Sequence, residues 1–220
     1  MTKKAVVLLS GGLDSAVTLY IAKKDYECSV LIFNYGQRAL IETEYAQKLV
    51  EYSRDKYYMM DISLPWKGSA LLDKTMLIPS GEVSACGSIP DTYVPARNII
   101  FLSFGVSFAE AIGASAVFIG AHQLDFSNYP DCTDVFFESF QKTIDVGTKT
   151  GREQGKIEIK TPLLCMTKKE IVETGNRLKV PFQYTWSCYE GGKVSCGKCE
   201  SCLFREQAFA DSGIPDPLGK

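Results

Sequence analysis

The chain has 220 residues, 45% of them hydrophobic, and its 24 basic and 26 acidic side chains leave a net charge of -2. That length suits one domain with a full core, or one domain with a small appendage. This near-neutral charge gives no sign of a protein that wraps nucleic acid. No apolar run is long enough to span a membrane. The chain has a single histidine, His122, so it cannot build a zinc hydrolase site with several histidine ligands. The apolar run near Met1 is too short for a signal peptide, so we expect a cytoplasmic protein with reduced thiols.

The first predicted element is a buried strand at residues 5–9, followed by a helix over residues 16–22. Between them lies the loop Ser10-Gly11-Gly12-Leu13-Asp14-Ser15. Paired glycines allow a tight turn and close approach to a ligand, and free N–H groups at a helix start favour an anion. The loop has neither the lysine of a Walker A loop nor the spacing of a dinucleotide fingerprint. A carboxylate inside such a cradle points to Mg²⁺ bridging it to phosphate.

We therefore expect this loop and the helix start to bind a nucleotide, the alternative being a turn without a ligand. The expected contacts are Leu9, Ser10, Gly11, Gly12, Leu13, Asp14, Ser15, Ala16, Val17, Thr18 and Leu19.

Strand and helix patterns alternate along the rest of the chain. Further strands are predicted at residues 29–35, 56–62, 115–121 and 157–161, and further helices at residues 40–52, 98–113, 135–147 and from Thr167. Thr167 and Glu170 have the spacing of a capping box. Residues 98–113 are apolar nearly all round, which predicts a helix buried on most sides, and residues 63–95 predict a long loop.

This alternation predicts an α/β fold with a Rossmann-like, parallel five-stranded sheet of order 3-2-1-4-5. In such sheets the ligand binds outside the carboxyl ends of the strands, where the order reverses. The Ser10–Ser15 loop is then expected beside Gly120-Ala121-His122, after the fourth strand.

Four cysteines cluster near the end of the chain as Cys188-x7-Cys196-x2-Cys199-x2-Cys202. In a reduced compartment this pattern indicates a metal site, and four sulfurs suit structural Zn²⁺, with an iron–sulfur cluster as the alternative. Gly197 suits a tight knuckle in which backbone N–H groups point at the sulfurs. We expect an ATP-binding domain over residues 1–184 and a small zinc-binding element over residues 185–220.

The Ser10–Ser15 loop resembles the SGGxDS loop of the PP-loop ATP pyrophosphatases. This resemblance implies the adenine nucleotide alpha hydrolase-like fold, which contains a parallel sheet of the kind predicted above. Further segments resemble the 7-cyano-7-deazaguanine synthase family within that superfamily, and they run in the family's order over nearly the whole chain. These segments are residues 34–38, 93–98, 125–132, 161–163, Lys168, and 185–189 with the three later cysteines. Two positions depart from the family pattern: Thr133 stands where arginine is common, and Ala39 where histidine is frequent.

The resemblance implies a ligase that converts 7-carboxy-7-deazaguanine and ammonia to the nitrile through adenylated acid and amide intermediates, in queuosine tRNA-base biosynthesis. It implies ATP, Mg²⁺ and Zn²⁺ as cofactors and a homodimer, with no stable nucleic-acid or membrane partner. The expected catalytic residues are Asp14, Ser15, Arg97, Asp125 and Lys168. The expected substrate contacts are Tyr35, Gln37, Arg38, Asn98, His122, Asp125, Tyr129 and Asp131.

Several alternatives stay open at this point. Arg97 and Lys168 could form surface ion pairs instead of phosphate contacts, and Asp125 and Asp131 could cap turns. His122 could move protons or be a satisfied residue at a strand end, while Cys132 could attack covalently or be a buried thiol. A tRNA-thiolating PP-loop enzyme, another AMP-forming amide ligase and a non-enzymatic metal knuckle remain as competing functions.

Overall fold

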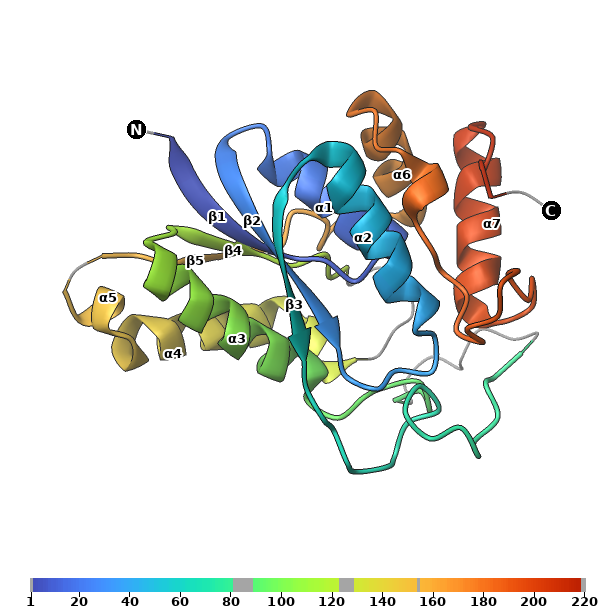
Figure 1. The fold of residues 1–220 in the computed structure, drawn as a ribbon, viewed down its shortest axis with the longest axis horizontal. Helices are drawn as coiled ribbons and strands as arrows, with labels where there is room; N and C mark the ends of the chain where they lie inside the picture. Colours follow the sequence, from blue (N-terminus) through green and yellow to red (C-terminus); the bar gives the residue numbers. More distant parts are fainter. Residues whose placement is uncertain (1, 81–88, 123–128, 154, 219–220) are drawn as a thin grey trace.

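One parallel five-stranded sheet organises the protein, in the order β3-β2-β1-β4-β5 (Figure 1). The structure is a computed structural model that describes residues 2–80, 89–122, 129–153 and 155–218. The predicted α/β class and strand order are confirmed. The strands are β1 (Lys3–Leu8), β2 (Tyr26–Asn34), β3 (Lys56–Asp61), β4 (Ala116–Phe118) and β5 (Glu158–Lys160).

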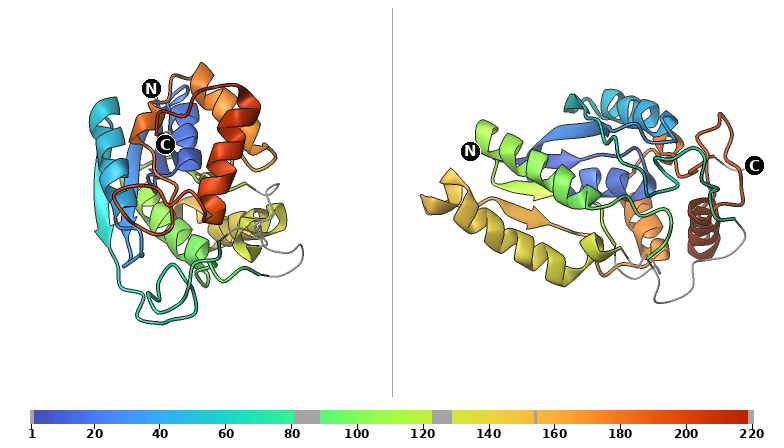
Figure 2. Two further views of the ribbon diagram at one scale, coloured as in Figure 1. Left: turned by 90° about the vertical axis from the view of Figure 1, so that its right-hand side faces the viewer. Right: turned by 90° about the horizontal axis from the view of Figure 1, so that it is seen from below.

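Helices cover both faces of this sheet (Figure 2). They are α1 (Leu13–Ala22), α2 (Ile41–Ser53), α3 (Arg97–Ile112), α4 (Asp134–Gly147), α5 (Lys149–Arg152), α6 (Lys168–Arg177) and α7 (Glu200–Ser212). One core cluster joins the sheet to α1, α2, α6 and α7, and a second joins its other face to α3 and α4. This doubly wound arrangement leaves the carboxyl ends of the strands free for loops.

The helix α3 departs from the sequence expectation of burial on most sides. Its inward side chains, Leu102 and Ala109, are fully buried against the sheet, whereas Ile99 is 41% and Phe104 36% exposed. The reason is positional. The helix lies on the outside of one sheet face, so only one of its sides contacts the strands.

The helix α6 begins with the predicted capping box. The Thr167 side chain accepts from the backbone N–H of Glu170 at 3.3 Å, and the Glu170 carboxylate accepts from the backbone N–H of Thr167 at 2.8 Å. Gly175 lies inside α6, although glycine is disfavoured within helices, because close packing leaves no room for a side chain there. A Cβ there would lie 2.5 Å from the Phe182 ring and 2.8 Å from Val17.

The sequence patterns do not predict the C-terminal helix α7. Its Arg205 is buried and forms a two-pronged ion pair with Asp216, with N–O distances of 2.7 and 2.8 Å. Arg205 also donates to Thr185 Oγ1 at 2.9 Å. These contacts fasten the end of the chain to the segment that precedes the cysteines.

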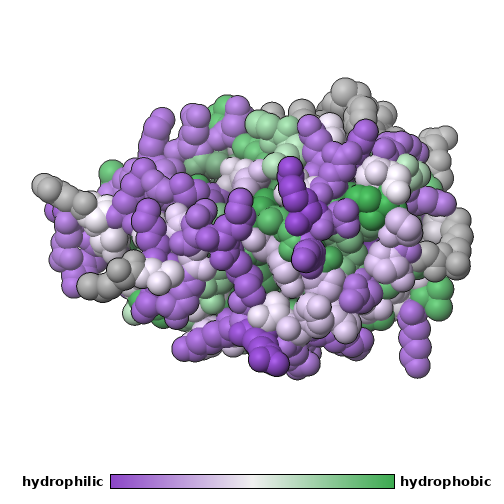
Figure 3. All heavy atoms as spheres, turned by 90° about the horizontal axis from the view of Figure 1, so that it is seen from above, coloured by the Kyte–Doolittle hydropathy of each residue, from purple (hydrophilic) through white to green (hydrophobic). Residues whose placement is uncertain are grey.

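One face of the molecule is mostly polar. Figure 3 shows hydrophilic side chains spread over the face seen from above, interrupted by smaller hydrophobic areas. Among the described residues, no helix has the length and apolar character needed to cross a bilayer.

Candidate active site

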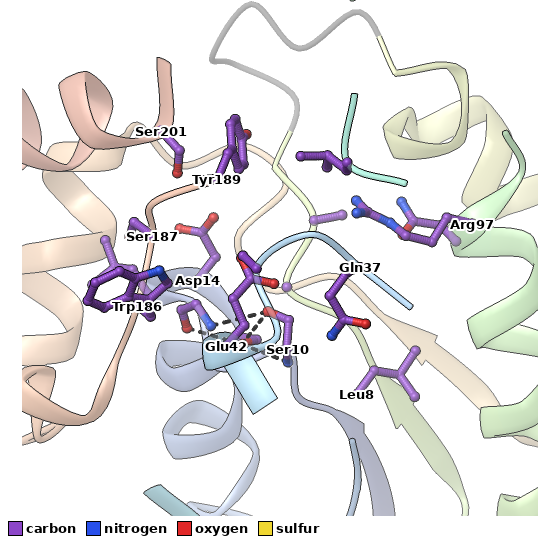
Figure 4. Close-up of a pocket in the computed structure, with 18 of the residues that line it drawn as sticks. Leu8, Ser10, Asp14, Gln37, Glu42, Arg97, Trp186, Ser187, Tyr189 and Ser201 are labelled. Atoms are coloured by element: carbon purple, nitrogen blue, oxygen red, sulfur yellow. Dashed lines mark hydrogen bonds between the residues drawn. The ribbon is translucent and has the colours of Figure 1, made fainter. Parts of the chain in front are cut away.

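A cleft of about 280 Å³ opens at the carboxyl ends of the central strands (Figure 4). It lies at the reversal of strand order, as the sequence predicts. Its lining comes from the loop after β1, the segments after β2 and β4, the starts of α2, α3 and α6, and the segment leading into α7. Residues far apart in sequence therefore share one site.

The Ser10–Ser15 loop is shaped by its own hydroxyl groups. The Ser15 hydroxyl donates to the Gly12 carbonyl at 3.0 Å and lies 3.0 Å from the Ser10 hydroxyl. The backbone N–H of Gly12 donates to the Ser10 hydroxyl at 3.2 Å. The loop thus has its turned shape without requiring a ligand.

Two glycines allow close packing around this loop. Gly11 has φ +89°, and a Cβ there would lie 2.1 Å from the carbonyl oxygen of Glu42. At Gly120, after β4, a Cβ would lie 2.9 Å from the backbone nitrogen of Ser15. The start of α2 and the end of β4 can therefore touch the loop only because both positions lack a side chain.

Asp14, Lys168 and His122 form a charged cluster at the mouth of the loop. Lys168 Nζ lies 2.8 Å from Asp14 Oδ2 and contacts His122 Nε2, and His122 Nε2 lies 3.5 Å from Asp14 Oδ2. Burial alone would raise the pKa of Asp14, but Lys168 and His122 lower it below its usual value. The other carboxylate oxygen, Oδ1, is buried and has no hydrogen-bond partner among the described residues. A free, buried carboxylate oxygen fits a hard cation such as Mg²⁺.

The nucleotide contacts expected from the sequence fall into two groups. Leu9, Ser10, Gly12, Leu13, Asp14 and Ser15 line the cleft. The others do not line it, and Thr18, a residue of α1, is wholly buried. This second group is Gly11, Ala16, Val17, Thr18 and Leu19.

Arg97 stands at the start of α3, across the cleft from the loop (Figure 4). Its Nη1 donates to the Tyr35 hydroxyl at 3.3 Å. The residue before it, Ala96, has φ +55°, a left-handed conformation that costs a non-glycine residue roughly 1–2 kcal/mol. The backbone N–H of Ala96 donates to the Tyr93 hydroxyl at 2.9 Å, which helps to hold this conformation.

The expected substrate contacts are also divided. Tyr35, Gln37, Arg38, Asn98, His122 and Tyr129 line the cleft, Asp131 does not, and Asp125 lies outside the described residues. The side-chain amide of Gln37 accepts from the backbone N–H of Tyr35 at 2.9 Å and donates to the Phe33 carbonyl at 3.3 Å. Its amide therefore shapes the turn after β2.

The carboxylate of Asp131 is buried and accepts from the backbone N–H of Asn98 at 2.9 Å. It caps the start of α3. Thr133, one of the departures from the family pattern, is the N-cap of α4, where its hydroxyl accepts from the backbone N–H of Phe136 at 3.1 Å. Ala39, the other departure, is buried.

Cys132 is a buried thiol that accepts from the Asn98 side chain at 3.1 Å. Burial and the neighbouring Asp131 raise the pKa of this thiol to about 11. Covalent attack needs a thiolate. The site therefore favours the buried-thiol interpretation over a sulfur-transferring nucleophile.

Glu42 is a cleft residue that sequence reasoning missed. It lies in the first turn of α2, and burial raises the pKa of its carboxyl to about 8, although Arg97 acts in the opposite direction. No motif marks Glu42. The one available signal is its place just after the Asn34–Arg38 segment.

The four clustered cysteines come together as the sequence predicts. The sulfurs of Cys188, Cys196, Cys199 and Cys202 all lie within 4.8 Å of one another. Tetrahedral Zn²⁺ with Zn–S bonds of about 2.3 Å places sulfurs about 3.8 Å apart, and Cys196 Sγ and Cys202 Sγ are 3.9 Å apart. The cluster can therefore bind a metal ion such as zinc.

The predicted knuckle geometry is confirmed as well. Gly197 has φ +68°, and the backbone N–H groups of Cys196 and Cys199 donate to the sulfurs of Cys188 and Cys196 at 3.3 Å.

Trp186 connects this knuckle to the phosphate loop. Its backbone N–H donates to the Gly11 carbonyl at 2.8 Å, and its indole N–H donates to the Cys188 carbonyl at 2.9 Å. The indole is buried and lies 5.2 Å from the Tyr45 ring. The indole packs in the small core cluster with the cysteines, and Trp186 also lines the cleft.

Comparisons with known proteins identify the family. The profile of the queuosine biosynthesis protein QueC matches residues 4–213. The chain belongs to this family. It is 46% identical over 217 residues to the 7-cyano-7-deazaguanine synthase of Desulfitobacterium hafniense, a match that covers 98% of this chain and 92% of that one. It is 47% identical over 222 residues to the enzyme of the same name from Nostoc punctiforme, covering 98% of each chain.

Solved structures support the fold alone. The NMN synthetase of Francisella tularensis matches with a TM-score of 0.50 and 18% identity, over 97% of this chain and 79% of that one. A predicted subunit of tRNA methyltransferase from Methanocaldococcus jannaschii matches with a TM-score of 0.51 and 14% identity, over 99% and 92% of the two chains. With the family relationship established, the chain is an enzyme of the 7-cyano-7-deazaguanine synthase family.

Proposed function

We propose that the enzyme converts 7-carboxy-7-deazaguanine and ammonia to 7-cyano-7-deazaguanine, cleaving ATP to AMP and diphosphate in each of two activation steps. The observation that carries this proposal is the Ser10–Ser15 loop at the end of β1, which opens with Asp14 and Lys168 into a cleft that also contains Arg97. A carboxylate resists attack because an oxide would have to leave. Transfer of AMP to its oxygen supplies a good leaving group, and the same activation of the amide oxygen leads to the nitrile.

In this proposal the phosphate loop grips the departing diphosphate through its N–H and hydroxyl groups. Lys168 and Arg97 offset negative charge as it develops around the α-phosphorus. Asp14 Oδ1 is available to hold Mg²⁺, which would further neutralise the phosphates. Ser15 keeps the loop in shape through its bond to the Gly12 carbonyl.

The acceptor would occupy the far half of the cleft. Its aromatic wall includes Phe33 and Phe101, stacked with ring centroids 4.2 Å apart, and Tyr35. Tyr129, Arg38 and Asn98 supply polar groups there. These substrate contacts, and those expected of His122, Asp125 and Asp131, all stay predictions, as does the homodimer. Zn²⁺ on the four cysteines would serve structure, because four sulfurs leave no open coordination position.

The direct test uses the purified chain with ATP, ammonium and 7-carboxy-7-deazaguanine. We expect AMP and a product whose mass and infrared stretch are those of the nitrile. Lys168→Met should abolish AMP formation, whereas Lys169→Met, which changes the exposed neighbour, should not. Release of ADP in place of AMP, or AMP formation without any nitrile, would contradict the proposal.

A further inference from the structure

Glu42 occupies the junction between the two halves of the cleft. Its backbone packs on the phosphate loop, where the carbonyl of Glu42 leaves no room for a side chain at Gly11. Its side chain lines the same cleft as Tyr35 and Arg97, which belong to the acceptor half. Figure 4 shows its side chain rising into the pocket between Asp14 and Gln37. The carbon whose oxygen receives AMP must lie at this same junction, between the α-phosphorus and the acceptor ring.

The Glu42 carboxyl also has no bonding partner among the described residues. It makes no hydrogen bond or ion pair with any residue among those that the structure describes. A partly buried carboxyl that faces a cleft without a partner is costly unless a ligand uses it. Its neighbour Glu44, in the same turn of α2, is exposed to solvent.

The proposed reaction requires a group that removes protons from nitrogen. When ammonia attacks the adenylated acid, a C–N bond forms, a proton leaves nitrogen, and AMP departs with the C–O electron pair. When the adenylated amide collapses, the N–H proton leaves, the nitrogen electrons complete the C≡N bond, and AMP departs again. Each step therefore needs a proton acceptor beside the reacting carbon.

Three other titratable groups at or near the cleft are engaged elsewhere. His122 Nε2 contacts the ammonium group of Lys168, which also holds Asp14. The Asp131 carboxylate caps α3 through Asn98, and Cys132 is a high-pKa thiol that accepts from the same residue.

We propose that Glu42 is the catalytic proton acceptor for nitrogen in both C–N bond-forming stages. This assignment rests on the proposed function. The pKa of the carboxyl, raised to about 8 by burial, suits a base that works near neutral pH, because a stronger base takes up a proton more readily. Arg97 stabilises the ionised form across the cleft.

The test separates activation from nitrogen chemistry. Substrate-dependent exchange of labelled diphosphate into ATP, measured without ammonia, reports adenylation alone. Rapid-quench formation of the amide and nitrile with ammonia reports the later steps. The variant is Glu42→Gln, which keeps the size of the side chain, and the matched control is Glu44→Gln. A second variant, Glu42→Ala, is assayed with and without added formate.

We expect Glu42→Gln to keep diphosphate exchange and to lose about 10²-fold or more in nitrile formation. Formate should partly restore nitrile formation in Glu42→Ala, and Glu44→Gln should match the parent enzyme. Unchanged nitrile formation in Glu42→Gln would overturn the proposal. A parallel loss of exchange would also overturn it, because Glu42 would then serve activation. Absence of exchange in the parent enzyme would instead refute the proposed function.

Discussion

The phosphate loop lines the cleft, and the cysteine knuckle lies next to residues that line it, Ser187, Tyr189 and Glu200 among them, yet different forces hold the two regions. The loop follows β1, whose Val6 and Val7 are wholly buried between two helix layers, and its own hydroxyls complete its shape. The knuckle rests on a small cluster that includes Trp186, Ile78 and the cysteines themselves. Burial of apolar surface can maintain the first region without a ligand, whereas we expect a metal ion bound by the four sulfurs to contribute to the stability of the second. The comparison teaches that the two walls of one site can have separate stabilities.

Metal removal should give the largest difference in stability between the knuckle and the phosphate loop. Structural zinc contributes on the order of 10 kcal/mol in small zinc peptides, so a chelator should release the knuckle and the Ile78–Ser80 segment, which is bridged to Cys199. Hydrogen exchange should then rise over residues 78–80 and 187–202 and stay low in β1. Cys188→Ser should act like the chelator, and Cys165→Ser, which changes an exposed thiol, should not. Equal loss of protection in β1 would show that the two regions unfold as one.

The next effect concerns the loop itself. Gly11→Ala combines a left-handed φ with a Cβ 2.1 Å from the Glu42 carbonyl, so we expect the free energy of unfolding to fall by about 3 kcal/mol. Gly36→Ala is the matched control, because Gly36 has φ +78° but nothing within 4 Å of its Cβ position. Its cost should be about 1–2 kcal/mol. Denaturant unfolding measures both, and equal costs would contradict the close packing of α2 on the loop.

A smaller effect is expected from Lys168→Met, which leaves the Asp14 carboxylate without its cation. The pKa of Asp14 is lowered in the folded protein, so its contribution to stability is present above its unfolded pKa and is lost as pH falls through its folded value. Stability at neutral pH should therefore fall by about 1–3 kcal/mol, and the difference from the parent should shrink in acid. Lys169→Met breaks only an exposed pair at 3.8 Å and should change little. A difference that does not depend on pH would argue against the ion pair.

The smallest effect should come from Thr167→Ala at the capping box of α6. Loss of the hydroxyl that accepts from Glu170 N–H should cost about 1 kcal/mol. Lys168 is the first residue of α6, so affinity for ATP should weaken together with the thermal midpoint. An unchanged midpoint would show that tertiary packing alone fixes the start of the helix.

Local patterns made part of this molecule predictable. The apolar runs of β1 and β2, the Ser10–Ser15 loop, the Thr167–Glu170 box and the cysteine spacing each carry their structure within a few residues. The sheet order followed from the alternation of strands and helices, and it is confirmed.

Long-range contacts explain what the sequence did not provide. Glu42 belongs to the cleft because α2 starts against Gly11. The Asp131 carboxylate accepts a hydrogen bond from the backbone N–H of Asn98 at the start of α3. Gln37 has a substrate-like side chain, but its amide is bonded to the backbone at both ends. The helix α7 has a weak amphipathic pattern and is held by the buried Arg205. The domain division at residues 184 and 185 stays a prediction.

Trp186 gives this enzyme an internal optical probe. The chain has two tryptophans, and Trp66 is 46% exposed whereas Trp186 is 3% exposed. With Trp66→Phe, the remaining emission comes from an indole hydrogen-bonded to Cys188, in a residue whose backbone is bonded to Gly11. A red shift on chelation and a separate intensity change on addition of nucleotide would let one fluorescence titration follow both walls of the cleft.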